Sequence, residues 1–476
     1  MSSGRGNINM ATQSEVKNQL GVNYNPDPKA SLTFLERFAY GTGDFASNIV
    51  YSAISIFLVY YYTDVVHVNA AAVGSIMLIS RIFDGISDIV MGVIVDRTRS
   101  KYGKARVWVM RMAIPYALSA ILLFSVPANA SDMFKIVYVF LSYNLVSTII
   151  FTAINVPYAT MNAMMTQNQY ERALLGTFRM LLATAGTLFI NTFTLKFVDY
   201  FGGDPRAWTL TFAVFGLMTV AILLFTFMFT HERVIEEERT EENKRSVVEE
   251  FKALLKNKYW LMMTAVIFLM YLSLTVNGGS AVYYAKTVLN DPAFVVPLGN
   301  ATTIAQISTM FFTAPFIKRM GKRNVILVGM LVTALGYIVV IMAGSTYSMI
   351  LTGNVIKGIG SGFAASCLWG MLSDTIEYGE WKTGIRTAGL ANSASSFGSK
   401  VGSGLGGAIL GWIIAAGGYD GEATVQTSSA ISAVNAVYIY VPLALTAVSL
   451  IFVYLYKLDR EYDNIIKDLD ERKLEK

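Results

Sequence analysis

The sequence predicts an all-α protein that crosses a membrane many times. Hydrophobic residues make up 54% of the 476 positions and charged residues only 15%, whereas soluble chains contain about 25% charged residues. A soluble protein of this composition would expose large apolar patches. Stretches of about 20 apolar residues, the length that crosses a bilayer as a helix, recur from one end of the chain to the other.

Twelve apolar stretches can be placed along the chain, in two sets of six. The longest charged run separates the sets, and we expect it to be a solvated loop that ends in a short amphipathic helix. The expected spans are 39–62, 70–95, 107–127, 134–163, 175–198 and 208–230, then 258–285, 293–317, 324–344, 348–373, 388–416 and 430–456. The expected domains are a tail at 1–34, a six-helix bundle at 35–230, a middle loop at 231–257, a second six-helix bundle at 258–457 and a tail at 458–476.

Positive charges indicate the orientation in the membrane. Lysine and arginine gather in loops 96–106 and 318–323, whereas the alternate loops contain almost none. Short basic loops stay in the cytoplasm, so both termini are expected there. The net charge of +5 is therefore interpreted as a signal of membrane topology rather than of nucleic-acid binding. No signal peptide is apparent in residues 1–30. Because each basic loop follows the second helix of its set, the chain is expected to repeat six helices in parallel, as in the major facilitator fold.

The second expected span contains two carboxylates that need partners inside the membrane. An ionisable side chain near a helix centre costs about 2.5–3.5 kcal/mol on insertion scales. Asp84 and Asp88 are four residues apart and share one helical face. Ser87 lies beside them, and Arg81 lies one turn before. The pair either takes up a proton, holds a hard cation such as Na⁺, or only forms ion pairs that lock helices together. Two acids against one local base favour a coupling-ion site.

A second group of polar residues suits a hydroxyl-rich solute. Asp44 and Asn48 are four residues apart in the first span. Asn155 precedes Pro157, which interrupts backbone hydrogen bonding and favours a cavity. Carboxylate and amide groups together offer the acceptors and donors that sugar hydroxyls need. The aromatic face of Trp369 can stack on a sugar ring.

The other motifs do not point to an enzyme. His67 and His231 are the only histidines and lie outside the expected spans, so no Ser/His triad or histidine metal cluster can form in the membrane. No Gly-x-x-x-x-Gly-Lys-Ser/Thr motif is present. We therefore expect no cofactor, and transport that either draws its energy from an ion gradient or has no energy source. The glycine-rich stretch 402–407 indicates close helix packing, and Lys357 is interpreted as a packing or snorkelling residue.

Several motifs follow one another along the chain in a characteristic order. They are Tyr40-Gly41-x-Gly43-Asp44-x-x-x-Asn48, Tyr61-Tyr62-Thr63-Asp64-Val65, Arg81-Ile82-Phe83-Asp84-x-x-x-Asp88, Thr98-Arg99-Ser100-Lys101-Tyr102-Gly103-Lys104, Asn155-Val156-Pro157-Tyr158 and Asp374-Thr375-Ile376-Glu377-Tyr378-Gly379-Glu380-Trp381-x-x-Gly384-x-Arg386. Together they resemble the glycoside–pentoside–hexuronide:cation symporter family. The resemblance implies a major facilitator fold and alternating access around a central sugar site.

The resemblance also implies roles for individual residues. Asp84 and Asp88 fall on the family's cation-site carboxylates, with Ser87 and Thr152 as further oxygen ligands. Asp44 and Asn155 fall where the melibiose permease branch has sugar-binding aspartates. The full expected substrate-binding set is Asp44, Asn48, Asn155, Arg179, Trp369, Ser396 and Lys400.

Departures from the melibiose branch refine the expected substrate. That branch has Asp where this chain has Asn155, Trp where it has Ala159, and Asn where it has Ser87. The Asn155–Tyr158 motif instead resembles the branch that transports xylosides, pentoses and glucuronides. We expect import of a pentoside or xyloside coupled to H⁺, with Na⁺ as the alternative ion, by a monomer in the bacterial cytoplasmic membrane. The alternatives are glucuronide or galactoside symport, an uncoupled facilitator or exporter of the same fold, and a non-transporting receptor.

Overall fold

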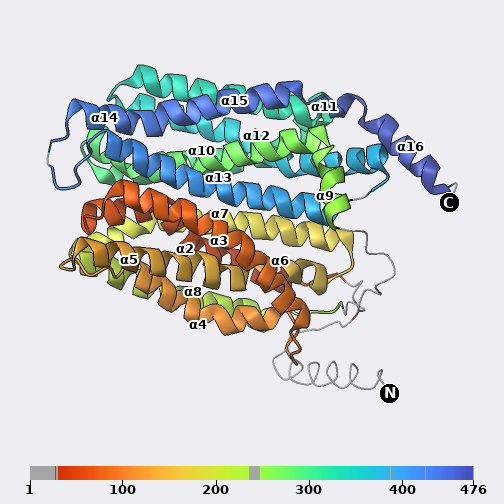
Figure 1. The fold of residues 1–476 in the computed structure, drawn as a ribbon, viewed down its shortest axis with the longest axis horizontal. Coiled ribbons are helices and arrows are strands. Elements are labelled where there is room, and N and C mark those ends of the chain that lie inside the picture. Colours follow the sequence, from red (N-terminus) through yellow and green to blue (C-terminus); the bar gives the residue numbers. More distant parts are fainter. Residues whose placement is uncertain (1–26, 28–30, 235–246, 386, 424, 475–476) are drawn as a thin grey trace.

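Long helices running side by side make up the protein. The computed structural model describes residues 27, 31–234, 247–385, 387–423 and 425–474, and every regular element within them is helical. The helices follow the longest axis of the molecule, and short segments join them at its two ends (Figure 1). The predicted all-α class is confirmed.

The helices of the first half begin close to the expected positions. They are α2 (Phe34–Tyr60) continuing into η1 (Tyr61–Val65), α3 (Ala70–Arg97), α4 (Arg106–Leu123), α5 (Asp132–Asn144) continuing through η2 (Leu145–Ile150) into α6 (Phe151–Met165), α7 (Gln169–Tyr200) and α8 (Pro205–Phe229). The wide π-turn of η2 places polar residues beside α3, and such turns are frequent at functional sites.

The second half follows the same pattern after a short helix, α9 (Val247–Leu255). Its helices are α10 (Lys258–Val288), η4 (Pro292–Phe294), α11 (Val295–Ala343), α12 (Tyr347–Thr383), α13 (Ala388–Ala416), α14 (Ser428–Asn435) continuing through η5 (Ala436–Tyr440) into α15 (Val441–Leu455), then η6 (Leu458–Arg460) and α16 (Tyr462–Leu474). The short helix α9 lies where the middle loop was expected to end in one, and α16 lies within the expected C-terminal tail. Most of the expected N-terminal tail and residues 235–246 of the middle loop lie outside the described residues.

Twelve membrane helices can be traced through the described part of the chain. Ten stretches are long and apolar enough to cross a membrane. One of them, Pro292–Ala343, contains 52 residues and breaks at Gly321, whose φ of 77° is not helical and favours glycine. That stretch therefore contains two membrane helices. Gly321 separates them and lies between the expected spans 293–317 and 324–344. The 28-residue helix α3 is the twelfth.

The helices form two bundles that pack against each other: an N-terminal bundle, α2 to α8, and a C-terminal bundle, α10 to α15 (Figure 1). Between the bundles α3 packs on α13, α2 on α10 and α7 on α11. Glycines permit close approach: a Cβ added to Gly74 in α3 would lie 2.9 Å from the carbonyl oxygen of Ala408 in α13. A Cβ added to Gly406 would lie 2.7 Å from the carbonyl oxygen of Leu272 in α10. The interpretation of residues 402–407 as a packing stretch is confirmed.

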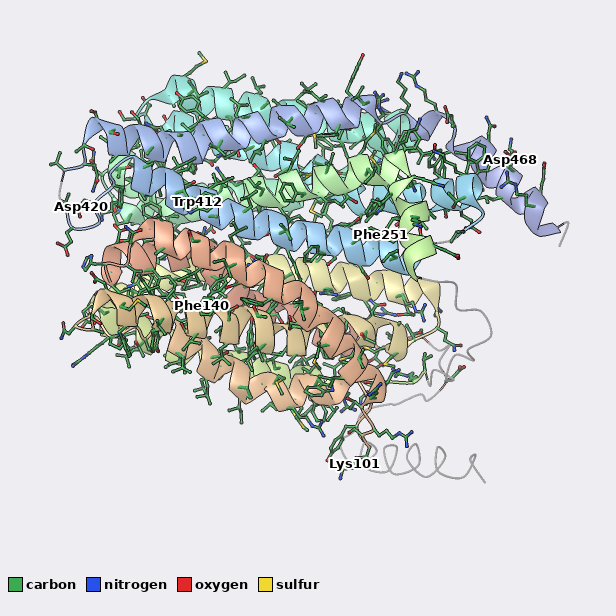
Figure 2. The ribbon with its side chains drawn as sticks, viewed as in Figure 1. Lys101, Phe140, Phe251, Trp412, Asp420 and Asp468 are labelled. Atoms are coloured by element: carbon green, nitrogen blue, oxygen red, sulfur yellow. The ribbon has the colours of Figure 1, made fainter. Side chains whose placement is uncertain are left out.

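The two ends of the molecule differ in charge. Lys101 lies at one end, in the basic loop between α3 and α4, and we call this the basic end (Figure 2). Asp420 lies at the opposite end, between α13 and α14, and we call this the Asp420 end (Figure 2). The helices α9 and α16 both lie at the basic end (Figure 1).

Candidate functional site

Asp84 is sealed inside the N-terminal bundle, with 1% of its surface exposed. Arg81 Nη1, on the same helix, donates to Asp84 Oδ2 at 2.7 Å, and Thr148 Oγ1 of η2 donates to Asp84 Oδ1 at 2.5 Å. Arg81 Nη2 also donates to the hydroxyl of Tyr143 at 3.1 Å. Both carboxylate oxygens are therefore occupied by groups from one bundle.

Asp88, one turn further along α3, is held from both bundles. Lys400 Nζ of α13 donates to Asp88 Oδ2, and Thr152 Oγ1 of α6 donates to Asp88 Oδ1 at 3.2 Å. The side chains of Asp88 and Lys400 are 31% and 19% exposed. Ser87 Oγ donates to the backbone oxygen of Thr148, and this hydrogen bond links α3 to η2. The predicted ligand Thr152 does reach a carboxylate.

The four charged groups form two balanced pairs. The sequence places Arg81 near two acids, and the structure adds Lys400 from the other bundle. The sequence suggested that two acids share one base, which would leave one negative charge unbalanced. In this conformation each acid has its own base, so that inference is wrong. Lys400, which is also among the expected sugar-binding residues, contacts Asp88 in this conformation. An ion pair that is partly open to solvent contributes little to stability.

A second cluster brings together three of the predicted sugar-binding residues. Arg179 Nε of α7 donates to Asp44 Oδ2 of α2 at 2.6 Å. Arg179 Nη2 donates to Asn155 Oδ1 of α6 at 3.5 Å. The guanidinium lies over the ring of Tyr158, 5.0 Å from its centroid. Asp44 is mostly buried, with 12% of its side chain exposed. Arg179 and Asn155 are half-buried, so a solute reaches the guanidinium and the amide most easily.

Three other predicted residues lie apart from these contacts. Asn48 Nδ2 donates to the backbone oxygen of Asp44 at 2.9 Å, within its own helix. Ser396 is exposed on α13, four residues before Lys400 and so on the same helical face. Trp369 is exposed and lines a cavity of about 340 Å³ between α7 and the C-terminal bundle.

Sequence reasoning missed two features of the site. Thr148 contacts Asp84; its position four residues before Thr152 was the available signal, because that spacing puts both hydroxyls on one face. Lys357 of α12 was interpreted as a packing or snorkelling residue. It is 3% exposed and lines the 340 Å³ cavity, and its Nζ has no hydrogen-bond partner among the described residues. Lys357 therefore does not snorkel.

Buried polar groups join the two bundles at the Asp420 end. Lys286 Nζ of α10 donates to Asp64 Oδ1 at 2.5 Å, and the Tyr419 hydroxyl donates to the same oxygen at 2.8 Å. The hydroxyls of Thr63 and Tyr283 lie 2.6 Å apart. The Asp64 side chain is only 2% exposed. We call these residues the Asp64 network, and they link the two bundles at this end.

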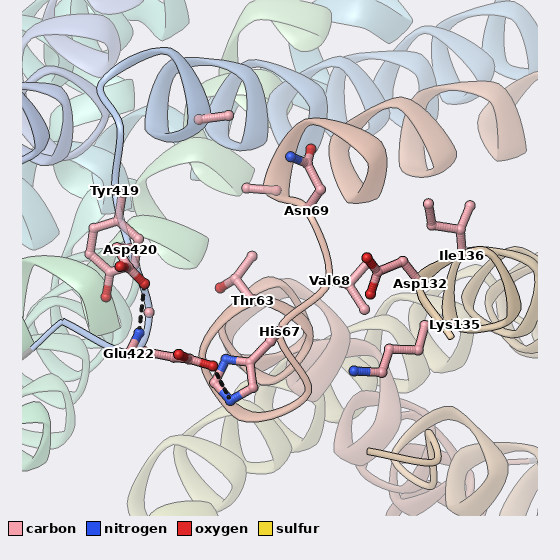
Figure 3. Close-up of a pocket in the computed structure, with 13 residues that line it drawn as sticks. Thr63, His67, Val68, Asn69, Asp132, Lys135, Ile136, Tyr419, Asp420 and Glu422 are labelled. Carbon is pink, nitrogen blue, oxygen red and sulfur yellow. Dashed lines mark hydrogen bonds and ion pairs between the residues drawn. The ribbon is translucent and has the colours of Figure 1, made fainter. Parts of the chain in front are cut away.

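A surface pocket of about 550 Å³ lies beside the Asp64 network (Figure 3). Two of its lining residues are in contact, with His67 Nε2 lying 3.6 Å from Glu422 Oε1. Lys135 Nζ donates to the backbone oxygen of Val66 at 2.9 Å. The pocket is lined by loops and helix ends, and by neither carboxylate of the α3 pair. It lies at the Asp420 end of the molecule.

Two six-helix bundles with ionisable residues paired across their interface define a membrane transport protein. The sequence matches the family described as MFS/sugar transport protein over residues 39–460, and the chain belongs to this family. The expected major facilitator fold is thereby confirmed, and the protein is a transporter rather than an enzyme.

Individual proteins similar to this chain agree with that assignment. The isoprimeverose transporter of Lactiplantibacillus pentosus is 32% identical over 455 residues, covering 93% of both chains. The putative glycoside/cation symporter YagG of Escherichia coli (strain K12) is 32% identical over 441 residues, covering 90% of this chain and 92% of the relative. Among solved structures, a D-xylose-proton symporter matches with a TM-score of 0.63 at 12% identity, covering 90% of this chain and 99% of that one. The resemblance found in the motifs is confirmed.

Proposed function

We propose that this chain imports a pentoside, such as a xyloside, together with H⁺, with Na⁺ as the alternative cation. The observation that supports cation coupling most directly is the contact of Asp88 with Lys400, because a carboxylate of one bundle takes its counter-charge from the other. The printed functions of the two relatives, an isoprimeverose transporter and a glycoside/cation symporter, support the substrate class.

The coupling cation competes with Lys400 for Asp88. A proton or Na⁺ on Asp88 removes its attraction for the lysine, so α13 is released from α3 and the bundles can move apart. Thr152 Oγ1 lies 3.2 Å from Asp88 Oδ1 and supplies a further oxygen to the cation. Asp84, when freed from Arg81, and Ser87 would complete an oxygen shell for Na⁺.

The Asp44–Arg179–Asn155 cluster recognises the sugar. Arg179 has five N–H donors, of which two are directed at Asp44 and Asn155. Sugar hydroxyls can donate to the Asp44 carboxylate and to the amide oxygen of Asn155, and can accept from the guanidinium. Trp369, on the wall of the nearby cavity, offers an aromatic face to the sugar ring. By linkage, cation and sugar each tighten the binding of the other.

Alternating access requires the Asp64 network to form and break. With that network formed, the Asp420 end is closed and the path to the site runs from the basic end. Short basic loops stay in the cytoplasm, so this conformation faces inward, and both termini lie in the cytoplasm of a bacterial cell. A single chain supplies every residue of both clusters, which supports a monomer.

Purified protein in liposomes tests the proposal. Uptake of labelled xylose, a xyloside, a glucuronide and a galactoside is measured under separate pH and Na⁺ gradients. We expect a xyloside to accumulate above equilibrium under an inward H⁺ gradient, and a protonophore to abolish the accumulation. Equilibration without accumulation under every gradient would show an uncoupled facilitator. No counterflow of any of these sugars would contradict sugar transport itself.

The orientation is tested with two matched cysteines. The native Cys367 is buried, so Lys101→Cys and Glu422→Cys each introduce one accessible thiol. In intact cells an impermeant maleimide should label Glu422→Cys and leave Lys101→Cys unlabelled until the membrane is opened. The reverse pattern would invert the proposed topology.

A further inference from the structure

The side chain of Arg81 in α3 lies against a glycine of the other bundle. A Cβ added to Gly404 of α13 would overlap Cγ of Arg81 and would lie 2.9 Å from its Cβ and 3.3 Å from its Cδ. Carbon atoms in contact are normally about 3.5–4.0 Å apart. The three atoms nearest to the added Cβ all belong to the Arg81 side chain. A glycine at position 404 therefore leaves room for the arginine between the two helices.

The aliphatic stem of Arg81 depends on this packing for its position. Hydrogen bonds hold the far end of the side chain, because Nη1 donates to Asp84 Oδ2 and Nη2 donates to the hydroxyl of Tyr143. The Nε atom is buried and has no hydrogen-bond partner among the residues that the structure describes. The stem is therefore positioned by the atoms packed around it, and Gly404 is a neighbour that the C-terminal bundle contributes.

The face of α13 that contains Gly404 also contacts α3 beside the two acids. A Cβ added to Gly85 of α3 would lie 2.5 Å and 2.8 Å from two ring carbons of Phe397 in α13. Lys400 Nζ donates to Asp88 Oδ2. Phe397, Lys400 and Gly404 are spaced i, i+3 and i+7, so they lie on one face of α13. This face therefore packs on the part of α3 that holds the arginine and both carboxylates.

The geometry points to Gly404 as a positioning residue that keeps Arg81 on Asp84 and thereby keeps Asp84 closed to Na⁺. This inference rests on the proposed cation coupling. While α13 lies against α3, the confined stem holds the guanidinium at the Asp84 carboxylate. When Lys400 releases Asp88 and α13 moves, Gly404 no longer confines the arginine, and Na⁺ can then compete for Asp84. The movement that begins at Asp88 thus controls access to the second acid.

Thermal unfolding of purified protein measures whether Gly404 acts through Arg81. Asp84→Asn leaves the arginine unpaired and lowers the midpoint of the wild type. In Gly404→Ala the added methyl group has already displaced Arg81, so Asp84→Asn should lower the midpoint by less than about half as much. Gly407→Ala is the matched control, because its methyl group meets the flexible end of Met77 at the same interface. There Asp84→Asn should have its full effect. An equal effect of Asp84→Asn in all three backgrounds would overturn the inference.

A rescue experiment covers the case in which Gly404→Ala does not fold. Arg81→Ala combined with Asp84→Asn removes the ion pair together with the Cγ atom that obstructs position 404. Adding Gly404→Ala to this double variant should lower the midpoint by less than it does in the wild type. Recovery of folded protein in the triple variant would be the same result. An equal loss in both backgrounds, or failure of the triple variant to fold, would show that the methyl group clashes with another residue and would overturn the inference.

Na⁺ binding tests the effect of Gly404 on Asp84 directly. The rise of the thermal midpoint is measured as NaCl replaces choline chloride at constant ionic strength, since a cation that binds the folded protein stabilises it. Gly404→Ala should bind Na⁺ about tenfold more tightly than the wild type, roughly the value of one charge-assisted hydrogen bond, and Gly407→Ala should match the wild type. Unchanged Na⁺ binding in Gly404→Ala would overturn the inference. These measurements need no sugar, so a failure of the wild type to take up methyl β-D-xyloside in liposomes would contradict only the proposed function.

Discussion

Asp84 and Asp88 lie one helical turn apart on α3 and differ in what holds them. Asp84 is 1% exposed and bonded to Arg81 and Thr148, both within the N-terminal bundle. Asp88 is partly exposed and bonded to Lys400 of the C-terminal bundle. A pair inside one bundle can persist while the bundles move, whereas a pair between bundles must change. The difference makes Asp88 the group that couples cation binding to movement. Asp84 positions α3, and it would join the cation site only if Na⁺ separates it from Arg81.

The largest effect is expected from Asp88→Asn. The amide binds neither a coupling proton nor a cation with the strength of a carboxylate, so sugar accumulation should fall to simple equilibration. Counterflow of labelled sugar without a gradient should continue. Asp88→Glu, which keeps the charge, is the control and should retain part of the accumulation. Wild-type accumulation by Asp88→Asn would remove Asp88 from the coupling mechanism.

We expect Asp84→Asn to lower the stability of the protein more than Asp88→Asn does. Removing the carboxylate leaves Arg81 buried and unpaired, which costs about 3–5 kcal/mol, and the thermal midpoint of purified protein should fall sharply. Asp88→Asn breaks a partly exposed pair and should cost less than about 1 kcal/mol. Equal destabilisation by the two substitutions would erase the distinction between the two acids.

Thr148, which contacts Asp84, and Thr152, which contacts Asp88, test the same difference between the two acids. Thr148→Val removes a hydrogen bond to the fully buried Asp84 and should cost about 1.5–3 kcal/mol of stability. Thr152→Val removes the longer contact with Asp88, so it should cost less stability and weaken cation-dependent uptake. Thermal unfolding and the cation dependence of uptake, measured on both variants, check the pattern; a larger stability loss for Thr152→Val would reverse it.

A smaller effect is expected from Lys400→Met. This substitution removes the internal competitor for Asp88, so the cation concentration for half-maximal uptake should drop by about fivefold, equivalent to the roughly 1 kcal/mol of a partly exposed pair. Lys400→Arg should stay near the wild type. In the Asp88→Asn background Lys400→Met should change nothing further, because the interaction is already lost. A higher cation requirement in Lys400→Met would show that the lysine assists cation binding.

Local patterns in the sequence predicted much of the fold and part of the site. Apolar stretches of membrane length predicted twelve helices, and the spacing of Asp84 and Asp88 placed them on one face. The family motifs pointed to Thr152, Asp44, Asn155 and Arg179, which the structure finds in contact with the expected partners or with one another.

Contacts between residues far apart in the sequence could not be predicted from local sequence patterns. Lys400 is 312 positions from Asp88, and only the packing of α13 on α3 makes them neighbours. The Asp64 motif was recognised, but its contacts with Lys286 and Tyr419 also depend on how the bundles meet. No acidic side chain lines the cavity beside Lys357 among the described residues, and no spacing along α12 could indicate this.

Sugar affinity as a function of cation concentration tests the central role of Asp88 most directly. Calorimetric dissociation constants for the transported sugar are measured across a range of pH at fixed Na⁺, and across Na⁺ at fixed pH, for the wild type and Asp88→Asn. We predict that affinity rises with one of the two cations in the wild type and is independent of both in Asp88→Asn. The same cation dependence in both proteins would contradict coupling through Asp88.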